Sequence, residues 1–170
     1  TMEYIHGRAM SEWRKTGSVT IRQQIMILRD VMLAVAHAHA HGVIHRDLKP
    51  QNILIDVENR PYITDFGLAK TVGTDASVSL TAAGSLVGTP CYMSPEQARG
   101  AKEIDGRTDV YALGAILYEI LAGRPPFTGE SLVEIISKVV HEPVLRPSEV
   151  PAGRTNPALD PTIEKICLKA

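Results

Sequence analysis

The chain has 170 residues, enough for one domain with its own core, and its 44% hydrophobic content excludes a disordered chain. Its 18 lysines and arginines balance 19 aspartates and glutamates, so a net charge of −1 gives no electrostatic support for a nucleic-acid partner. The two cysteines form no disulfide framework, and no apolar run reaches the roughly 18 residues needed to span a membrane.

The first half of the chain predicts a helical domain that also contains strands. The expected elements are an extended segment at 1–7, a short helix at 9–15, a long helix at 20–42, and strands at 53–55 and 62–64. The long helix rests on apolar residues that recur at spacings of three and four from Ile21 to Ala36. Thr20 is its expected N-cap and Gly42 its expected C-terminal cap.

The second half predicts further helices and two irregular stretches. The expected elements are a loop at 68–93, a short helix at 95–98, a helix at 105–122 capped by Asp105, a helix at 131–140, a proline-rich loop at 143–161 and a last helix from 161 or 162. Apolar residues cover nearly every face of the helix at 105–122, so we expect it to be buried. The loop at 68–93 is longer than an ordinary connection, which favours a functional segment. The predicted class is α+β and predominantly helical.

One motif carries most of the functional information. His45-Arg46-Asp47-Leu48-Lys49-Pro50 is followed by Gln51-Asn52, and Asp65-Phe66-Gly67 comes after the second predicted strand. A carboxylate can accept the proton of a hydroxyl nucleophile, and a nearby lysine can neutralise charge on a transferred phosphoryl group. An asparagine and an aspartate offer oxygen ligands of the kind that Mg²⁺ prefers. A polar loop without chemistry is the alternative.

These motifs resemble the catalytic loop and metal-binding turn of Hanks-type Ser/Thr protein kinases, most closely the bacterial branch. The resemblance covers essentially all of residues 1–170. It implies a protein kinase-like fold, with the C-terminal lobe containing a small β-hairpin and the N-terminal lobe absent. The implied divisions are a hinge at 1–7, the long helix, catalytic loop and hairpin at 8–64, an activation segment at 65–96, and a truncated helical lobe at 97–170.

The resemblance implies transfer of the γ-phosphate of ATP, with Mg²⁺, to Ser or Thr hydroxyls of protein substrates. Asp47 is expected to be the catalytic base, Lys49 to stabilise the transferring group, and Thr89 to contact both. Asn52 and Asp65 are expected to hold Mg²⁺.

Residues at the start of the chain are implied to face the adenine ring. Met2 matches the gatekeeper position, and the main chain of Glu3 and Ile5 is expected to pair with adenine. Leu54 is expected to pack beneath the ring. The family's glycine-rich loop, strand lysine and helix glutamate precede this hinge, so we expect residues 1–170 alone to be marginally stable and nearly inactive.

Regulation is implied for the residue before the catalytic aspartate. Arg46 is expected to bind a phosphate on the activation segment, carried by Thr81 or, next, Ser79. Phosphorylation there would order the loop, and trans-autophosphorylation would involve self-association. A merely flexible, hydroxyl-rich loop is the alternative.

Other positions are implied to be structural. His45 and Phe66 are expected to pack together in an internal spine, and Asp109 to brace the backbone of the catalytic loop. Ser94-Pro95-Glu96 stands where the family more often has Ala-Pro-Glu. Glu96 is expected to be buried and to pair with an arginine beyond the last helix.

Several alternatives stay open. A pseudokinase or inactive binding module, and a kinase of small molecules, compete with the protein kinase. His37, His39 and His41 are interpreted as favourable charges at a helix C-terminus rather than a metal site, and Cys91 as a packed residue rather than a redox centre. We expect a cytoplasmic location, with a membrane anchor elsewhere in the protein left open.

Overall fold

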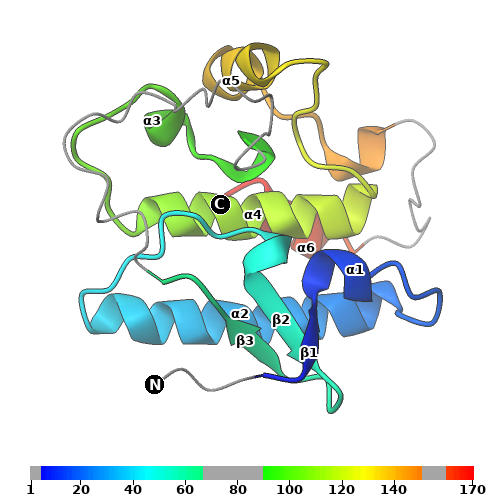
Figure 1. Ribbon diagram of the computed structural model, residues 1–170. Coiled ribbons are helices and arrows are strands. Elements are labelled where there is room, and N and C mark those ends of the chain that lie inside the picture. Colours follow the sequence, from blue (N-terminus) through cyan, green and yellow to red (C-terminus); the bar gives the residue numbers. More distant parts are fainter. Residues whose placement is uncertain (1–4, 67–89, 151–159) are drawn as a thin grey trace.

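The computed structural model describes residues 5–66, 90–150 and 160–170, and it is mostly helical with one small sheet (Figure 1). The helices are α1 (Met10–Trp13), α2 (Ile21–Ala40), α3 (Pro95–Ala98), α4 (Arg107–Ala122), α5 (Leu132–His141) and α6 (Pro161–Cys167). The strands are β1 (Gly7–Ala9), β2 (Ile53–Asp56) and β3 (Pro61–Ile63). Short 3₁₀ turns lie at Pro50–Asn52, Pro90–Tyr92 and Pro147–Glu149.

Helix α2 forms as its sequence predicts. The side chain of Thr20 accepts a hydrogen bond from the backbone of Gln23. In this reciprocal capping box the Gln23 side chain accepts from the backbone N–H of Thr20, so two backbone donors that the first turn would leave unpaired are satisfied. At the other end, Gly42 has a φ of 73°, a left-handed conformation that glycine adopts without steric cost. The predicted caps at both ends are therefore confirmed.

The sheet is larger than the predicted hairpin. Strands β2 and β3 pair antiparallel as expected, but β1 adds a third strand on the other edge of β2. The sequence predicts an extended segment only to residue 7 and a helix from residue 9. Gly7 permits this pairing, because a Cβ there would lie 2.7 Å from the carbonyl oxygen of Ile55. A three-residue strand that depends on one glycine shows no alternation of apolar and polar residues, so the sequence does not predict it.

Helix α4 is the centre of the molecule. It is buried along most of its length, as the sequence predicts, and it packs against α2. Figure 1 shows α2 and α4 side by side, with the sheet on the α2 side and α3 and α5 beyond α4. The cap was predicted wrongly: Gly106 is the N-cap residue, while Asp105 lies one residue earlier and accepts from the backbone N–H of Arg107 at 2.9 Å.

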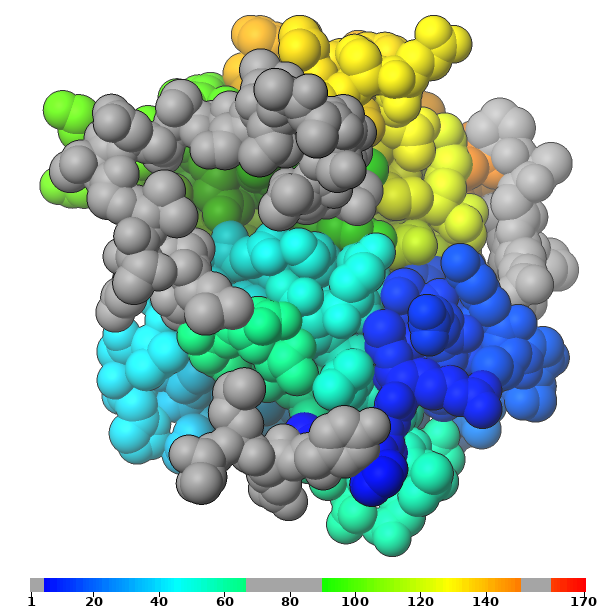
Figure 2. Space-filling model, viewed as in Figure 1, coloured from blue at the N-terminus to red at the C-terminus, as the bar shows by residue number. Residues whose placement is uncertain are grey.

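The segment between α2 and β2 carries the candidate catalytic motif. It leaves the end of α2, crosses α4 and enters the sheet, and Figure 2 shows it in cyan at the centre of one face of the molecule. Helices α5 and α6 begin within one residue of the predicted positions, and the structure adds their N-caps, Ser131 for α5 and Asp160 for α6. Within the described ranges, no helix combines the length and apolar character that crossing a membrane requires.

Candidate active site

A buried carboxylate on α4 holds the backbone that precedes Asp47. Asp109 is only 1% exposed, and its Oδ2 accepts from the backbone N–H of His45 at 2.9 Å, while its Oδ1 accepts from that of Arg46 at 2.8 Å. The same Oδ2 lies 2.8 Å from Nε2 of His39. A buried charge needs several such partners to offset its desolvation.

The backbone that Asp109 holds has an unusual conformation. Arg46 has a φ of 68°, in the left-handed region, which costs a non-glycine residue of the order of 1–3 kcal/mol. The hydrogen bonds that the backbone N–H groups of His45 and Arg46 donate to Asp109 offset this strain, so the loop keeps this conformation.

Three polar side chains converge just after this strained residue. Nζ of Lys49 lies 2.7 Å from Oδ2 of Asp47, and Nδ2 of Asn52 donates to the same oxygen at 3.2 Å and to the backbone carbonyl of Asp47 at 2.8 Å. The side chain of Asp47 is 54% exposed and that of Lys49 is 17% exposed. The carboxylate is therefore fixed by its neighbours and still open to a hydroxyl from outside.

Asp65 reaches this cluster through the end of β3. The backbone N–H of Thr64 donates to the carbonyl of Asn52 at 2.9 Å, and its hydroxyl lies 3.2 Å from Oδ2 of Asp65. Asp65 is exposed and has a φ of 62°. The chain thus turns sharply beside Asn52 and presents a carboxylate at the surface.

The donor set at Asn52 and Asp65 fits magnesium better than zinc or iron. It offers amide and carboxylate oxygens, and among the described residues no group of three or more His, Cys, Asp or Glu could enclose a metal. Mg²⁺ suits such a set because it binds through one or two protein ligands and fills its shell with phosphate and water. The Nδ2 of Asn52 is used by Asp47, which leaves its Oδ1 as the oxygen that a cation would meet.

His45 supports the loop from the inside. Its ring is 1% exposed, lies with its centroid 4.7 Å from that of Phe66 at an angle of 61°, and its Nε2 is 2.8 Å from the carbonyl of Thr64. The backbone N–H of Asp47 donates to Nδ1 at 3.3 Å, so the network assigns the ring proton to Nε2. Phe66 itself is 39% exposed.

The histidine tract contains a contact that sequence reasoning missed. His37 and His41 form an exposed ring pair with centroids 4.4 Å apart, whereas His39 faces the opposite way and contacts Asp109. A signal for this was present, because residues two apart on a helix point in nearly opposite directions. His39 therefore supports the site through Asp109 and is more than a charge at the end of α2.

Glu96 is less buried than predicted, and the Arg46 side chain has a buried nitrogen without a hydrogen-bond partner among the described residues. Glu96 is half-buried rather than buried, because it lies in the first turn of α3, a helix of one turn at the surface. Nε of Arg46 is buried and has no hydrogen-bond partner among the described residues.

Other predicted site residues are only partly placed. Ile5 lies half-buried just before β1, and Leu54 lies half-buried on β2 opposite Ala9. Five predicted positions lie outside the described residues: Met2, Glu3, Ser79, Thr81 and Thr89.

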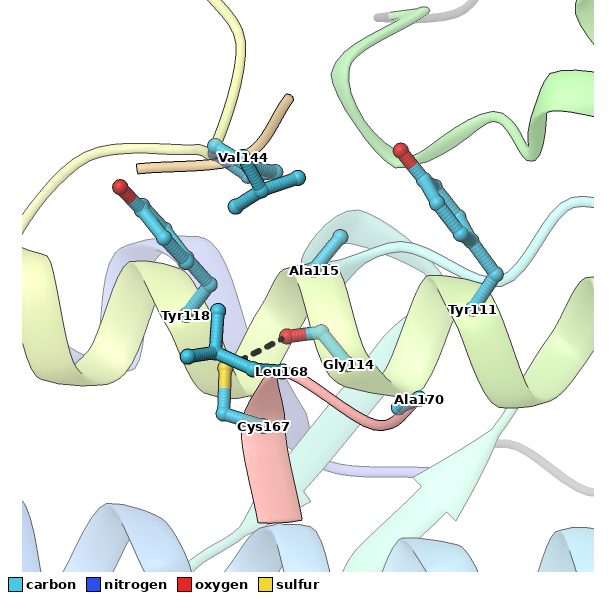
Figure 3. Close-up of a pocket in the computed structure, with 9 residues that line it drawn as sticks. Tyr111, Gly114, Ala115, Tyr118, Val144, Cys167, Leu168 and Ala170 are labelled. Carbon is cyan, nitrogen blue, oxygen red and sulfur yellow. Dashed lines mark hydrogen bonds between the residues drawn. The ribbon is translucent and has the colours of Figure 1, made fainter. Parts of the chain in front are cut away.

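An apolar pocket on the far side of α4 is separate from this cluster. Figure 3 shows Tyr111 and Tyr118 rising from one side of α4, with α6 ending beside them. The cavity measures about 130 Å³, and Sγ of Cys167 donates to the carbonyl of Gly114 at 3.6 Å. Burial raises the pKa of Cys167 to about 12 and also raises that of Cys91, so neither thiol favours the thiolate that redox chemistry needs.

Comparison with known proteins gives a consistent result. The family model described as protein kinase domain matches residues 1–166. The serine/threonine-protein kinase PknB of Mycolicibacterium smegmatis is 41% identical over 170 residues, covering 99% of this chain and 26% of the relative. The kinase PrkC of Bacillus subtilis is 41% identical, with 99% and 25% covered, and PknB of Mycobacterium tuberculosis is 39% identical, with 99% and 26% covered. The chain spans about a quarter of the length of these curated relatives.

Proposed function

The chain belongs to the protein kinase family, and from this premise we propose that the whole protein is an ATP-dependent serine/threonine protein kinase. The observation that supports this most directly is the exposed carboxylate of Asp47, held between Lys49 and Asn52 on a loop that the buried Asp109 braces. The combination gives a fixed, accessible base next to a positive charge.

We further propose how the chain divides. Residues 1–7 would form the hinge, 8–64 the long helix, catalytic loop and hairpin, 65–96 the activation segment, and 97–170 the helical part of the C-terminal lobe. The central burial of α4 and the small sheet beside α2 support this division, because both give the catalytic loop a rigid base.

In the proposed reaction, ATP with Mg²⁺ supplies the γ-phosphoryl group and the cationic charge that phosphoryl transfer needs. Asp47 orients the Ser or Thr hydroxyl of a protein substrate and accepts its proton. Lys49, drawn toward Asp47 in this structure, stabilises negative charge on the transferring group. Asn52 and Asp65 would hold Mg²⁺ through their side-chain oxygens, and Thr89 would contact the catalytic pair.

Recognition of the nucleotide and regulation follow the same proposal. Ile5 and Leu54, with Met2 and Glu3, form the adenine side of the site. Arg46 binds a phosphate on Thr81 or Ser79. Its Nε is buried and has no acceptor among the residues that the structure describes, which supports this role.

The proposed partners are protein substrates that present Ser or Thr, and a second copy of the protein for autophosphorylation. We place the domain in the cytoplasm, where ATP is available and where the free thiols of Cys91 and Cys167 would stay reduced.

The base assignment is tested by Asp47→Asn in the whole protein. The variant keeps the shape of the side chain but loses its proton affinity, so we expect kcat to fall by about 10²- to 10⁴-fold with little change in ATP affinity. Phosphoserine and phosphothreonine formed from ATP and Mg²⁺ are measured by mass spectrometry. Asp30→Asn, on the exposed surface of α2, is the matched control and should keep full activity.

The metal assignment predicts a different result for Asp65→Asn. Removing this charge should weaken Mg²⁺-dependent binding of a non-hydrolysable ATP analogue, as measured by calorimetry with and without Mg²⁺. Asp47→Asn should leave that binding nearly unchanged. If both variants kept wild-type turnover, the proposed roles would be wrong, and a wild-type protein that binds ATP without transferring phosphate would be a pseudokinase.

A further inference from the structure

The peptide unit that joins Arg46 to Asp47 is held at both ends by side chains. Its carbonyl oxygen, on Arg46, accepts a hydrogen bond from Nε2 of Gln97 at 2.6 Å. Its N–H, on Asp47, donates to Nδ1 of His45 at 3.3 Å. The plane of this peptide sets the direction in which the Asp47 side chain leaves the backbone. Gln97 lies on α3, but it is connected to Asp47 through this single peptide unit, because it holds the carbonyl of Arg46.

The orientation of the Gln97 amide is fixed by its own partners. Its Oε1 accepts from the backbone N–H of Ser94 at 3.1 Å and from the hydroxyl of Thr108 at 2.6 Å. The flipped amide would set its NH₂ group against the N–H of Ser94, which can only donate, and its oxygen against the Arg46 carbonyl, which can only accept. Only one orientation satisfies all three contacts, and it directs Nε2 at Arg46.

The network behind Gln97 is buried and complete. Ser94 is 0% exposed and Thr108 is 1% exposed, and their hydroxyls lie 2.9 Å apart. The Thr108 proton is used for Gln97, so Ser94 donates to Thr108, and Oγ of Ser94 accepts from the backbone N–H of Gln97 at 3.4 Å. An alanine at position 94, the family's commoner residue, could make neither hydroxyl bond. The network ties the start of α3 to the start of α4 and leaves one amide donor for the catalytic loop.

A second capping box in the same chain shows what is special about Gln97. At the start of α2, Oε1 of Gln23 accepts from the backbone N–H and the hydroxyl of Thr20 at 2.8 and 2.9 Å. Gln23 is exposed, and its side chain serves the helix cap. A capping box needs only an acceptor at this position, so glutamate serves as well as glutamine. The Arg46 carbonyl, in contrast, needs the NH₂ donor that only glutamine provides.

We infer that Gln97 is a positioning residue for catalysis, which orients Asp47 by holding the carbonyl of Arg46, with Ser94 and Thr108 fixing Gln97 in turn. The inference rests on the proposed function, because it gives Asp47 the role of base. The bond at 2.6 Å opposes rotation of a peptide that the left-handed φ of Arg46 already strains. Small errors in the position of a catalytic group can cost up to about 10²-fold in rate.

The test compares Gln97→Glu with Gln23→Glu in the whole protein. Each variant keeps its capping box, but only Gln97→Glu replaces the donor to Arg46 with a carboxylate that repels the carbonyl. We expect kcat to fall by about tenfold or more for Gln97→Glu with the KM for ATP nearly unchanged, and the lost hydrogen bond to lower the thermal midpoint as well. Gln23→Glu should keep both kinetic constants.

The pH dependence separates positioning from simple loss of structure. At low pH the introduced carboxyl group is protonated and regains a donor for the Arg46 carbonyl, so the ratio of variant to wild-type kcat should rise as the pH falls. Gln97→Met, which cannot donate at any pH, should show a constant ratio. The charged and titratable groups near the network include Arg46, Asp47, Asp109 and Glu96 together with His39 and His45, and all the proteins compared share them, so the ratio isolates the introduced group.

Asp47→Asn in the same assay keeps the two proposals distinguishable. If Asp47→Asn removes activity while Gln97→Glu turns over like the wild type, the inference about Gln97 is wrong and the proposed function stands. If the Gln97→Glu ratio stays flat with pH, Gln97 is merely structural and the inference also fails. If Asp47→Asn keeps full activity, the proposed function itself is overturned.

Discussion

Asp109 joins three parts of the protein through one buried carboxylate. It accepts from two consecutive backbone N–H groups of the catalytic loop and contacts His39 at the end of α2. A neutral amide of the same shape has one acceptor oxygen and would turn its NH₂ group toward a donor. At the residue scale, the site therefore depends on a side chain that no substrate touches.

Asp109→Asn should accordingly destabilise the protein strongly. We expect the free energy of unfolding to fall by roughly 3 kcal/mol, because a buried donor loses its acceptor and the bond from His39 loses its charge. Urea unfolding followed by circular dichroism measures the change. Asp30→Asn removes an exposed pair with Arg29 and should shift the free energy by no more than about 0.5 kcal/mol. Equal effects from the two variants would contradict this account of Asp109.

At this scale, sequence spacing indicates the residues that we propose to carry the chemistry more readily than the residues that support them. Asp47, Lys49 and Asn52 form a local motif, and local motifs keep their geometry from chain to chain. His39 and Gln97 act through partners distant in sequence, Asp109 and the Arg46 carbonyl. Their roles need the three-dimensional arrangement, because neither residue type is unusual in a helix.

At the scale of elements, the end of α2 and the start of α4 meet too closely for an ordinary side chain. A Cβ at Gly106 would lie 2.9 Å from two atoms of the His39 ring, and the backbone there has an ordinary φ of −62°. Glycine is therefore required by the contact rather than by the backbone. The glycine lets His39 approach Asp109, and so connects the packing of two helices to the catalytic loop.

Gly106→Ala gives a prediction in which the direction of the effect is diagnostic. In a helical conformation, glycine to alanine normally stabilises a protein by about 0.4–1 kcal/mol. Here we expect a loss of roughly 1–3 kcal/mol in thermal or urea unfolding, because the new methyl group pushes the His39 ring from Asp109. A stabilised variant would show that a methyl group fits at position 106 without displacing the His39 ring, and would contradict this account of the contact between α2 and α4.

The elements themselves were predictable where periodicity and caps agree. The Thr20 cap and the left-handed Gly42 delimit α2 as expected, and the apolar composition of α4 predicts its burial. Strand β1 was not predicted, because its three residues carry no alternation and pair only through tertiary contact. The predicted cap of α4 was wrong by one residue. Asp105 accepts from the backbone N–H of Arg107, as a capping side chain does, but the N-cap position is Gly106.

At the scale of the whole molecule, buried acids on α4 and α6 make stability sensitive to alkaline pH. Burial, with the nearby charge of Glu96, raises the pKa of Tyr111 from 10.0 to about 12, and burial with Glu164 raises that of Cys167 from 9.0 to about 12. The folded state holds these protons more tightly than the unfolded state. Their contribution is therefore fully present below about pH 9 and is lost as the pH rises toward 12.

Tyr111→Phe tests this dependence. The hydroxyl of Tyr111 has no hydrogen-bond partner among the described residues, so its removal should leave stability at pH 7 unchanged or slightly higher. Between pH 10 and pH 12, the range set by the pKa shift of Tyr111, the variant should lose stability less steeply than the wild type in urea unfolding. Parallel curves for the two proteins would mean that Tyr111 titrates normally in the folded state.

Across these scales, one path of contacts runs from the buried centre to the exposed base. On helix α4, Asp109 binds the backbone of the loop directly, and Thr108 acts on it through Gln97. The loop in turn presents Asp47 at the surface. We propose that this rigid support allows Asp47 to accept the proton of a substrate hydroxyl while phosphate is transferred.

The most direct measurement is single-turnover transfer of labelled γ-phosphate from ATP to a Ser/Thr peptide by the whole protein, compared with Asp47→Asn. The account predicts phosphoserine or phosphothreonine with the wild type, and a rate constant at least about 10²-fold lower for the variant at equal ATP occupancy. Equal rate constants for the two proteins, or no transfer by a wild-type protein that binds ATP and Mg²⁺, would contradict it.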